Sequence, residues 1–222
     1  MLIKIKKEDL FMLRKITVAF LSCVLSLTFA TSLYAQAKAP AKKAPAATAA
    51  EKKPEIPKKK QTTLGLYVTA KQAYAMWQKD KNIKIIDCRT PEEYVFVGHA
   101  PMAYNIPGMF MKYRWNAKKK MYVMKANRRF VRQAKKVFKP TDTIMIMCRS
   151  GARSAKCVNR LAKAGFKKVY NIYDGFEGDK VKDKNSPQYG KRTVNGWRNS
   201  GAPWTYKLDV NLIYLPHGKK KK

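Results

Sequence analysis

Apolar and polar positions along residues 64–178 alternate between two periods. Short apolar runs rich in β-branched side chains, typical of strands, lie at 83–87, 103–107, 143–147 and 168–173. Segments with apolar side chains at helical spacing lie between or before these runs and begin near Thr69, Thr90, Asn127 and Arg153. Strands that alternate with helices predict an α/β fold, an open parallel β-sheet flanked by helices on both faces.

Two of these segments carry the strongest signals. Thr90 can cap the helix that follows it, Pro91 suits the first helical position, and Glu93 completes a capping box. The run TIMIM at 143–147 is apolar throughout, which is typical of a strand buried on both faces. We therefore expect this strand near the centre of the sheet.

The N-terminal part of the chain differs in composition from the rest. An apolar stretch at 16–30 follows five basic residues and precedes AQA at 35–37, which predicts a cleaved signal peptide over residues 1–37 and export to the periplasm. Residues 38–63 consist largely of Ala, Pro and Lys and predict a disordered linker, since they contain too little apolar surface to form a core.

The remaining boundaries follow from the same comparison. Residues 64–178 form the expected domain, with an insertion at about 108–128. Residues 179–218 are expected to pack on that domain as a C-terminal extension, in which Trp197, Trp204 and Tyr206 either cover one face or line the mouth of a pocket. Residues 219–222 form a lysine tail.

Charge is the strongest anomaly of composition, since 48 Lys and Arg against 14 Asp and Glu give a formal net charge of +34. Such a charge acts through attraction to anions and through solubility, and indicates little about fold. It fits a generally basic solvated surface, or lysine-rich segments held against anionic membrane or cell-wall polymers. The basic, aromatic stretch at 109–130 could suggest nucleic-acid binding, but we expect its aromatic side chains to be packed and expect no nucleic-acid partner.

Candidate chemistry lies in MCRSGARS at 147–154, directly after the central strand. Cys148 is placed at the carboxyl end of that strand, where open parallel sheets bind ligands. A tight turn into a helix aims backbone N–H groups at one point, Gly151 permits that turn, and Arg149 and Arg153 add positive charge. These effects favour a reactive thiolate. The alternative is a polar turn with a buried, inert cysteine.

Two blocks of sequence resemble the rhodanese-like sulfurtransferases of the exported, single-domain type: IIDCRTPEEYVFVGHAPMAYNIP at 85–107 and IMCRSGARSAKCVNRLAKAGFKKVYNIYDGF at 146–176. The resemblance implies that Cys148 takes a sulfane sulfur as a persulfide from an anionic donor such as thiosulfate. Cyanide or a thiol would then accept the sulfur, and no metal or organic cofactor is implied. The substrate-binding loop would consist of Arg149, Ser150, Gly151, Ala152, Arg153 and Ser154.

The length of the loop distinguishes a sulfurtransferase from the related phosphatases and arsenate reductases. Those families place five residues between the Cys and the Arg, because a tetrahedral oxyanion needs a wider cradle. Here four residues separate Cys148 from Arg153. The shorter loop favours a ligand the size of sulfur.

Several other polar or reactive residues have structural explanations. Asp87 and Arg89 are expected to form a buried or half-buried pair that braces the loops. Cys88 and Cys157 are expected in the core, although a Cys148–Cys157 disulfide is an alternative. His99 is expected to order a turn, and with His217 it makes no metal constellation.

The class of function has one competing hypothesis. The intact loop favours an enzyme, whereas the basic surface and the insertion leave open a sulfur-carrier or protein-binding module with little turnover on free thiosulfate. We expect a monomer.

Overall fold

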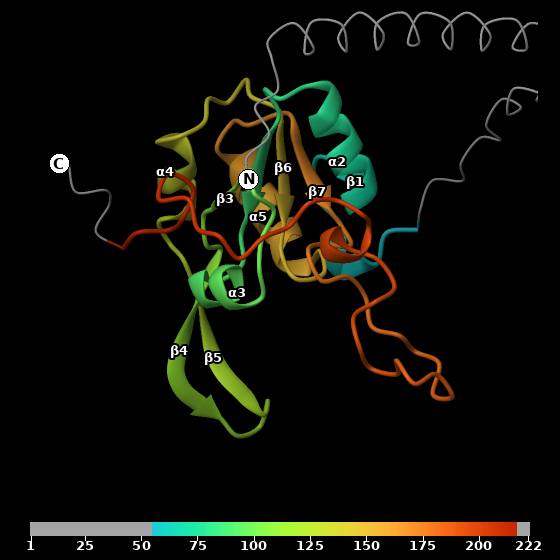
Figure 1. The fold of residues 1–222 in the computed structure, drawn as a ribbon. Coiled ribbons are helices and arrows are strands. Elements are labelled where there is room, and N and C mark those ends of the chain that lie inside the picture. Colours follow the sequence, from blue (N-terminus) through green and yellow to red (C-terminus); the bar gives the residue numbers. More distant parts are fainter. Residues whose placement is uncertain (1–54, 217–222) are drawn as a thin grey trace, which may run out of the picture. The chain divides into compact units, whose positions relative to one another are not determined.

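The computed structural model describes residues 55–216 and shows a five-stranded sheet covered by helices (Figure 1). All strand pairs of this sheet are parallel, in the order β1-β7-β6-β2-β3. The strands are β1 (Tyr67–Val68), β2 (Lys84–Asp87), β3 (Ala103–Asn105), β6 (Ile144–Met147) and β7 (Val169–Ile172). The helices are α2 (Ala70–Lys79), α3 (Pro91–Phe96), α4 (Phe130–Lys135) and α5 (Ala152–Lys163). The predicted open parallel sheet is confirmed.

The helix starts follow from capping residues. Thr69 and Gln72 form a capping box at α2, and Thr90 and Glu93 form another at α3, where Pro91 occupies the first helical position. Each box satisfies backbone donors that the first turn of a helix leaves unpaired. The helix expected from Asn127 begins later, at Phe130, because residues 127–129 form a turn.

The central strand β6 is buried at every position, as expected, and its side chains alternate between two cores. Ile144, Ile146 and Cys148 point to a core built with α4 and α5. Met145 and Met147 point to the opposite core, which α2 and the C-terminal segment complete. Cys148 therefore lies at the edge of the α4/α5 core rather than in an isolated surface turn.

The predicted insertion is a β-hairpin made of β4 (Met109–Asn116) and β5 (Met121–Ala126), which form a separate two-stranded sheet. It projects away from the five-stranded sheet (Figure 1). The expectation that its aromatic side chains are packed is wrong for three of them. Tyr113, Trp115 and Tyr122 are 82%, 58% and 47% exposed, and the Tyr122 ring meets the other two edge to face. A projecting hairpin has no second layer to cover them.

The predicted linker is too long at its C-terminal end. Residues 58–60 form a 3-10 turn, η1 (Lys58–Lys60), and Lys60 is only 4% exposed. Its ammonium pairs with Asp179 at 3.1 Å, and its carbonyl accepts a hydrogen bond from Asn171 at 3.0 Å. Composition argued for disorder, but long lysine stems pack well when the charge finds a carboxylate. Residues 55–63 therefore belong to the folded domain.

The C-terminal segment after β7 packs against the sheet. Trp197, in the short 3-10 helix η2 (Trp197–Asn199), is fully buried in the core beside α2. Asp174 accepts hydrogen bonds from the amides of Ala70 and Gly196, which joins this segment to the start of α2. Burial raises the pKa of Asp174, and these amide hydrogen bonds oppose the shift.

Among residues 55–216, no helix is long and apolar enough to cross a lipid bilayer. The predicted signal peptide at 1–37, the linker from 38 to 54 and the lysine tail at 219–222 lie outside the described residues.

Candidate active site

Cys148 directly follows β6, between the ends of two neighbouring parallel strands. The register places Met147 opposite Asp87 on β2, and the Cys88 amide donates to the Met147 carbonyl at 2.9 Å. On the other side, β7 ends at Ile172. The carboxyl ends of β2, β6 and β7 therefore surround the cysteine, as the sequence predicted for a ligand-binding edge.

The turn from Cys148 into α5 depends on Gly151. Its φ is +92°, and a Cβ built there would lie 2.0 Å from the Tyr173 carbonyl oxygen. In this geometry the Gly151 amide donates a hydrogen bond to the Cys148 sulfur at 3.2 Å. Only glycine fits this left-handed position without strain and without a clash.

Ser154 supplies further polar contacts to the sulfur. Its hydroxyl lies 3.5 Å from the Cys148 sulfur and 2.7 Å from the side-chain oxygen of Asn171. The single hydroxyl proton can serve only one of these acceptors at a time. Asn171 is fully buried on β7 and also donates to the Gly151 carbonyl at 3.2 Å.

The first two residues of the loop are held by the segment after β7. The Cys148 carbonyl accepts a hydrogen bond from the Phe176 amide at 2.7 Å. The Arg149 carbonyl accepts from the amides of Glu177 and Gly178 at 3.0 and 3.2 Å. The loop backbone is thus fixed on both sides, which preorganises the donors around the sulfur.

Several groups set the ionisation of Cys148. Burial alone would raise its pKa, but the Cys88 hydrogen bond, the Arg153 charge and hydrogen bonds from the Ser154 side chain and backbone outweigh burial. The pKa of Cys148 is therefore well below the usual value for cysteine, near 8.5. The thiolate is the reactive form of cysteine, so this shift favours nucleophilic chemistry at Cys148.

Cys88 and Cys157 are both buried beside this site, and all three cysteines among residues 55–216 are free thiols. Burial raises the pKa of Cys88 well above its usual value, and hydrogen bonds with Cys148 and Cys157 raise it further. The raised pKa favours the protonated form of Cys88 beside Cys148. No Cys148–Cys157 disulfide is present within this part of the chain.

Arg153 lies on the first turn of α5 and pairs with Glu93 of α3. Two parallel hydrogen bonds join the guanidinium to the carboxylate, at 2.6 and 2.5 Å. Burial opposes the charge of Glu93, but the Arg153 hydrogen bond and charge, with lesser help from Thr90 and Arg89, lower its pKa. Arg149 is instead exposed at the pocket. Of the two arginines that were expected to hold an anion, Arg149 is exposed and Arg153 is already paired with Glu93.

Asp87 and Arg89 form a fully buried pair, as predicted. Arg89 reaches Asp87 at 2.6 Å and the Gly98 carbonyl at 2.7 Å, and its guanidinium stacks over the Phe176 ring. Neither side chain lines the pocket around Cys148. The pair connects the loops after β2 and β7, which is a supporting role.

His99 also lies outside that pocket. Its ring stacks on Tyr94 and contacts the backbone carbonyls of Tyr94 and Lys207. Trp204 and Tyr206 of the C-terminal segment do not line the pocket either. Within residues 55–216, no three His, Cys, Asp or Glu side chains are grouped to hold a metal ion.

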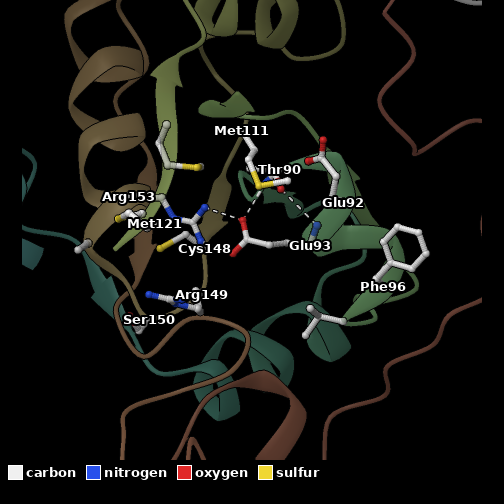
Figure 2. Close-up of a pocket in the computed structure, with 13 residues that line it drawn as sticks. Thr90, Glu92, Glu93, Phe96, Met111, Met121, Cys148, Arg149, Ser150 and Arg153 are labelled. Atoms are coloured by element: carbon white, nitrogen blue, oxygen red, sulfur yellow. Dashed lines mark hydrogen bonds and ion pairs between the residues drawn. The ribbon is translucent and has the colours of Figure 1, made fainter. Parts of the chain in front are cut away.

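A pocket of about 550 Å³ opens in front of Cys148 (Figure 2). Its polar walls come from the loop and from α3, and its apolar wall comes largely from the hairpin. The lining residues are Thr90, Glu92, Glu93, Phe96, Val97, Met111, Met121, Met124, Cys148, Arg149, Ser150, Ala152 and Arg153.

The structure brings together every predicted loop residue, and adds neighbours that sequence reasoning did not connect to the site. Glu93 was assigned only to a helix cap, Cys88 only to the core, and Asn171 to no role. The hairpin methionines lie in a segment that shows neither helical spacing nor a resemblance to the family, so the sequence did not connect them to the site. Glu93, Cys88 and Asn171 all lie in the two blocks that resemble the rhodanese-like proteins, and that position was the usable sequence signal.

Comparison with known proteins identifies the family of this chain. The chain belongs to the rhodanese-like domain family, whose pattern matches residues 69–182. An uncharacterised Rickettsia prowazekii protein, RP600, is 30% identical over 141 residues, which are 63% of this chain and 96% of that protein.

The relatives also include sulfurtransferases. Thiosulfate sulfurtransferase 18 of Arabidopsis thaliana is 36% identical over 93 residues, which are 41% of this chain and 62% of that protein. Among solved structures, Rv0390 from M. tuberculosis is 24% identical with a TM-score of 0.48, covering 63% of this chain and 96% of that chain.

Proposed function

We propose that this protein is a sulfurtransferase that carries a sulfane sulfur on Cys148. The observation that supports it most directly is the 3.2 Å hydrogen bond from the Gly151 amide to a buried cysteine sulfur that faces a pocket. The lowered pKa of Cys148 provides the thiolate that such chemistry needs.

In the first half-reaction, the Cys148 thiolate attacks the outer sulfur of a donor such as thiosulfate. A new S–S bond forms, the S–S bond of thiosulfate breaks, and sulfite leaves with the bonding electron pair. Amides of the loop, with the Ser154 hydroxyl, would then stabilise the negative outer sulfur of the Cys148 persulfide.

In the second half-reaction, an acceptor thiolate or cyanide attacks the outer sulfur of the persulfide. The persulfide bond breaks, and Cys148 leaves as the same stabilised thiolate. A low pKa helps this step as well, because it makes Cys148 a better leaving group. No residue outside the loop needs to transfer a proton.

Steady-state turnover tests this proposal against the alternative of a sulfur-carrier or protein-binding module. We expect thiocyanate to form from thiosulfate and cyanide, and Cys148→Ala to reduce the rate to the solution background. A loaded Cys148 with turnover equal to that background would favour the module. Capture of one specific periplasmic protein by the loaded form would then support it.

The cellular location remains a separate proposal. We propose an exported, periplasmic protein from the apolar run at 16–30 and its small-residue site at 35–37. N-terminal sequencing of the protein recovered from a periplasmic extract tests this, since a chain that retains residue 1 would contradict cleavage.

A further inference from the structure

One wall of the pocket consists of apolar side chains that a small inorganic substrate would leave unused. The wall is formed by the hairpin together with the end of α3: Met111, Met121 and Met124, with Phe96 and Val97. Figure 2 shows Met111 and Met121 among the residues that surround the pocket with Cys148 and Arg153.

Two of the three methionines lie on the same face of the hairpin. Met111 and Met124 are directly opposite each other in the antiparallel register, so their side chains lie on the same face. Met121 lies near the hairpin turn, is 45% exposed, and still reaches the pocket. Exposed apolar surface at a pocket mouth is surface that a bound group would remove from water.

The charges around the pocket do not favour a doubly charged substrate. Despite the net charge of +34, the lining contains two arginines and two glutamates, whose formal charges cancel. Arg153 is already neutralised by Glu93. The Oε2 atom of Glu92 is buried without a hydrogen-bond partner among the described residues. A doubly charged anion gains little net attraction from such a lining.

We propose that the preferred substrate of this site is an organic sulfur compound with an apolar group next to the transferable sulfur and no more than one negative charge. The hairpin methionines would select that group. This inference rests on the proposed persulfide chemistry of Cys148. Methionine suits the task because its flexible, polarisable side chain adapts to aliphatic and aromatic groups.

The chemistry balances with a thiosulfonate, R–SO2–S−, as the donor. The Cys148 thiolate attacks the outer sulfur, the S–S bond of the donor breaks, and the sulfinate R–SO2− leaves with the electron pair. The product is the Cys148 persulfide anion, so the charge is conserved and no external oxidant is needed. The group R lies against the methionines while the outer sulfur enters the loop.

The test compares benzenethiosulfonate with methanethiosulfonate, which have the same charge and differ only in R. The rate constant for the gain of one sulfur on Cys148 is measured at subsaturating donor by rapid quenching and intact mass. The ratio of the two rate constants is divided by the ratio that the same donors show with free glutathione. We expect a corrected preference for the benzene compound of about tenfold or more, as for one extra apolar group in a fitted pocket.

Two hairpin variants give the structural control. Met121→Gln combined with Met124→Gln places polar groups in the wall, so the corrected preference should fall several-fold. Tyr113→Gln changes the same hairpin at an exposed residue that does not line the pocket, and the preference should stay as in the wild type. Circular dichroism of the variants checks that the fold is retained.

The outcomes separate the two proposals. If both donors load Cys148 with a corrected ratio near one, the specificity inference is wrong and the sulfurtransferase proposal stands. A preference that survives in the Met121/Met124 variant would also overturn the role of the hairpin. If thiosulfate and both thiosulfonates leave Cys148 unloaded, the persulfide proposal itself fails, and this inference fails with it.

Discussion

The Arg153 guanidinium and the Glu93 carboxylate form a two-point ion pair that joins α5 to α3 across the pocket in front of Cys148. Both side chains are only about one-fifth exposed, at 21% and 23%. The pair therefore holds Arg153, whose charge lowers the pKa of Cys148, and limits the binding of further anions by that arginine.

Removal of this carboxylate should make the protein less stable and change the pH dependence of stability. We expect Glu93→Gln to lower the free energy of unfolding by about 1–2 kcal/mol at pH 7, between the values for exposed and buried pairs. The folded pKa of Glu93 lies below its unfolded value, so its contribution is full above about pH 4.3 and is lost as the pH falls through the folded pKa.

Urea unfolding at a series of pH values measures this difference. Glu92→Gln is the matched control, since it removes the same charge from the same helix without breaking the Arg153 pair. Equal effects of the two variants, or a Glu93→Gln effect that persists at low pH, would contradict the assigned role.

The ionisation of Cys148 can be measured by alkylation. A cysteine with an ordinary pKa loses about a hundredfold in rate between pH 8 and pH 6, because the thiolate fraction falls. We expect Cys148 to lose much less, since its pKa is already well below that range. The rate of iodoacetamide modification, located by peptide mass spectrometry, measures this. A hundredfold loss at Cys148 would show an ordinary thiol.

Cys88 and Cys157 offer a matched pair of substitutions. Both are buried thiols, but only Cys88 is among the groups that lower the pKa of Cys148. Cys88→Ala should raise the pKa of Cys148 and move the midpoint of its alkylation profile up by about one to two pH units, since a hydrogen bond to a charged group is worth about 1.5–3 kcal/mol. Cys157→Ala should leave the Cys148 profile unchanged. Identical profiles for the two variants would show that Cys88 does not lower the pKa of Cys148.

Alanine substitutions at Gly151 and Gly165 form a second matched pair, which tests the backbone of the loop. Both have positive φ, at +92° and +95°, but only a Cβ at Gly151 would meet the backbone of Tyr173. Gly165→Ala should cost about 1 kcal/mol from strain alone, whereas Gly151→Ala should cost more than about 2 kcal/mol and abolish persulfide formation. Denaturant midpoints give the comparison, and equal losses would mean that the Tyr173 contact is unimportant.

Much of the fold could be predicted because local signals agree with the tertiary structure. The capping box at Thr90, the apolar run of β6 and the glycine turn at 151 each specify one element, and all three meet at Cys148. The buried pair of Asp87 and Arg89 was predictable too, because both residues lie in the block at 85–107 that resembles the rhodanese-like family.

The parts that were missed depend on contacts between distant segments. The sequence near Lys60 resembles a linker, and only the position of Asp179 in the fold makes a buried lysine favourable. The hairpin was not predicted as a pair of strands, and its pairing register shifts between Lys112 and Trp115. Its methionines line the same pocket as residues of α3, which is a contact between distant segments that no local pattern encodes.

The most direct test of the central claim is the intact mass of the protein after brief incubation with excess thiosulfate and removal of the donor. We expect a gain of one sulfur atom per chain, located at Cys148, removed by a reductant and absent in Cys148→Ala. The persulfide proposal is contradicted if Cys148 is shown to be reduced and the wild-type mass still stays unchanged with thiosulfate and with thiosulfonate donors.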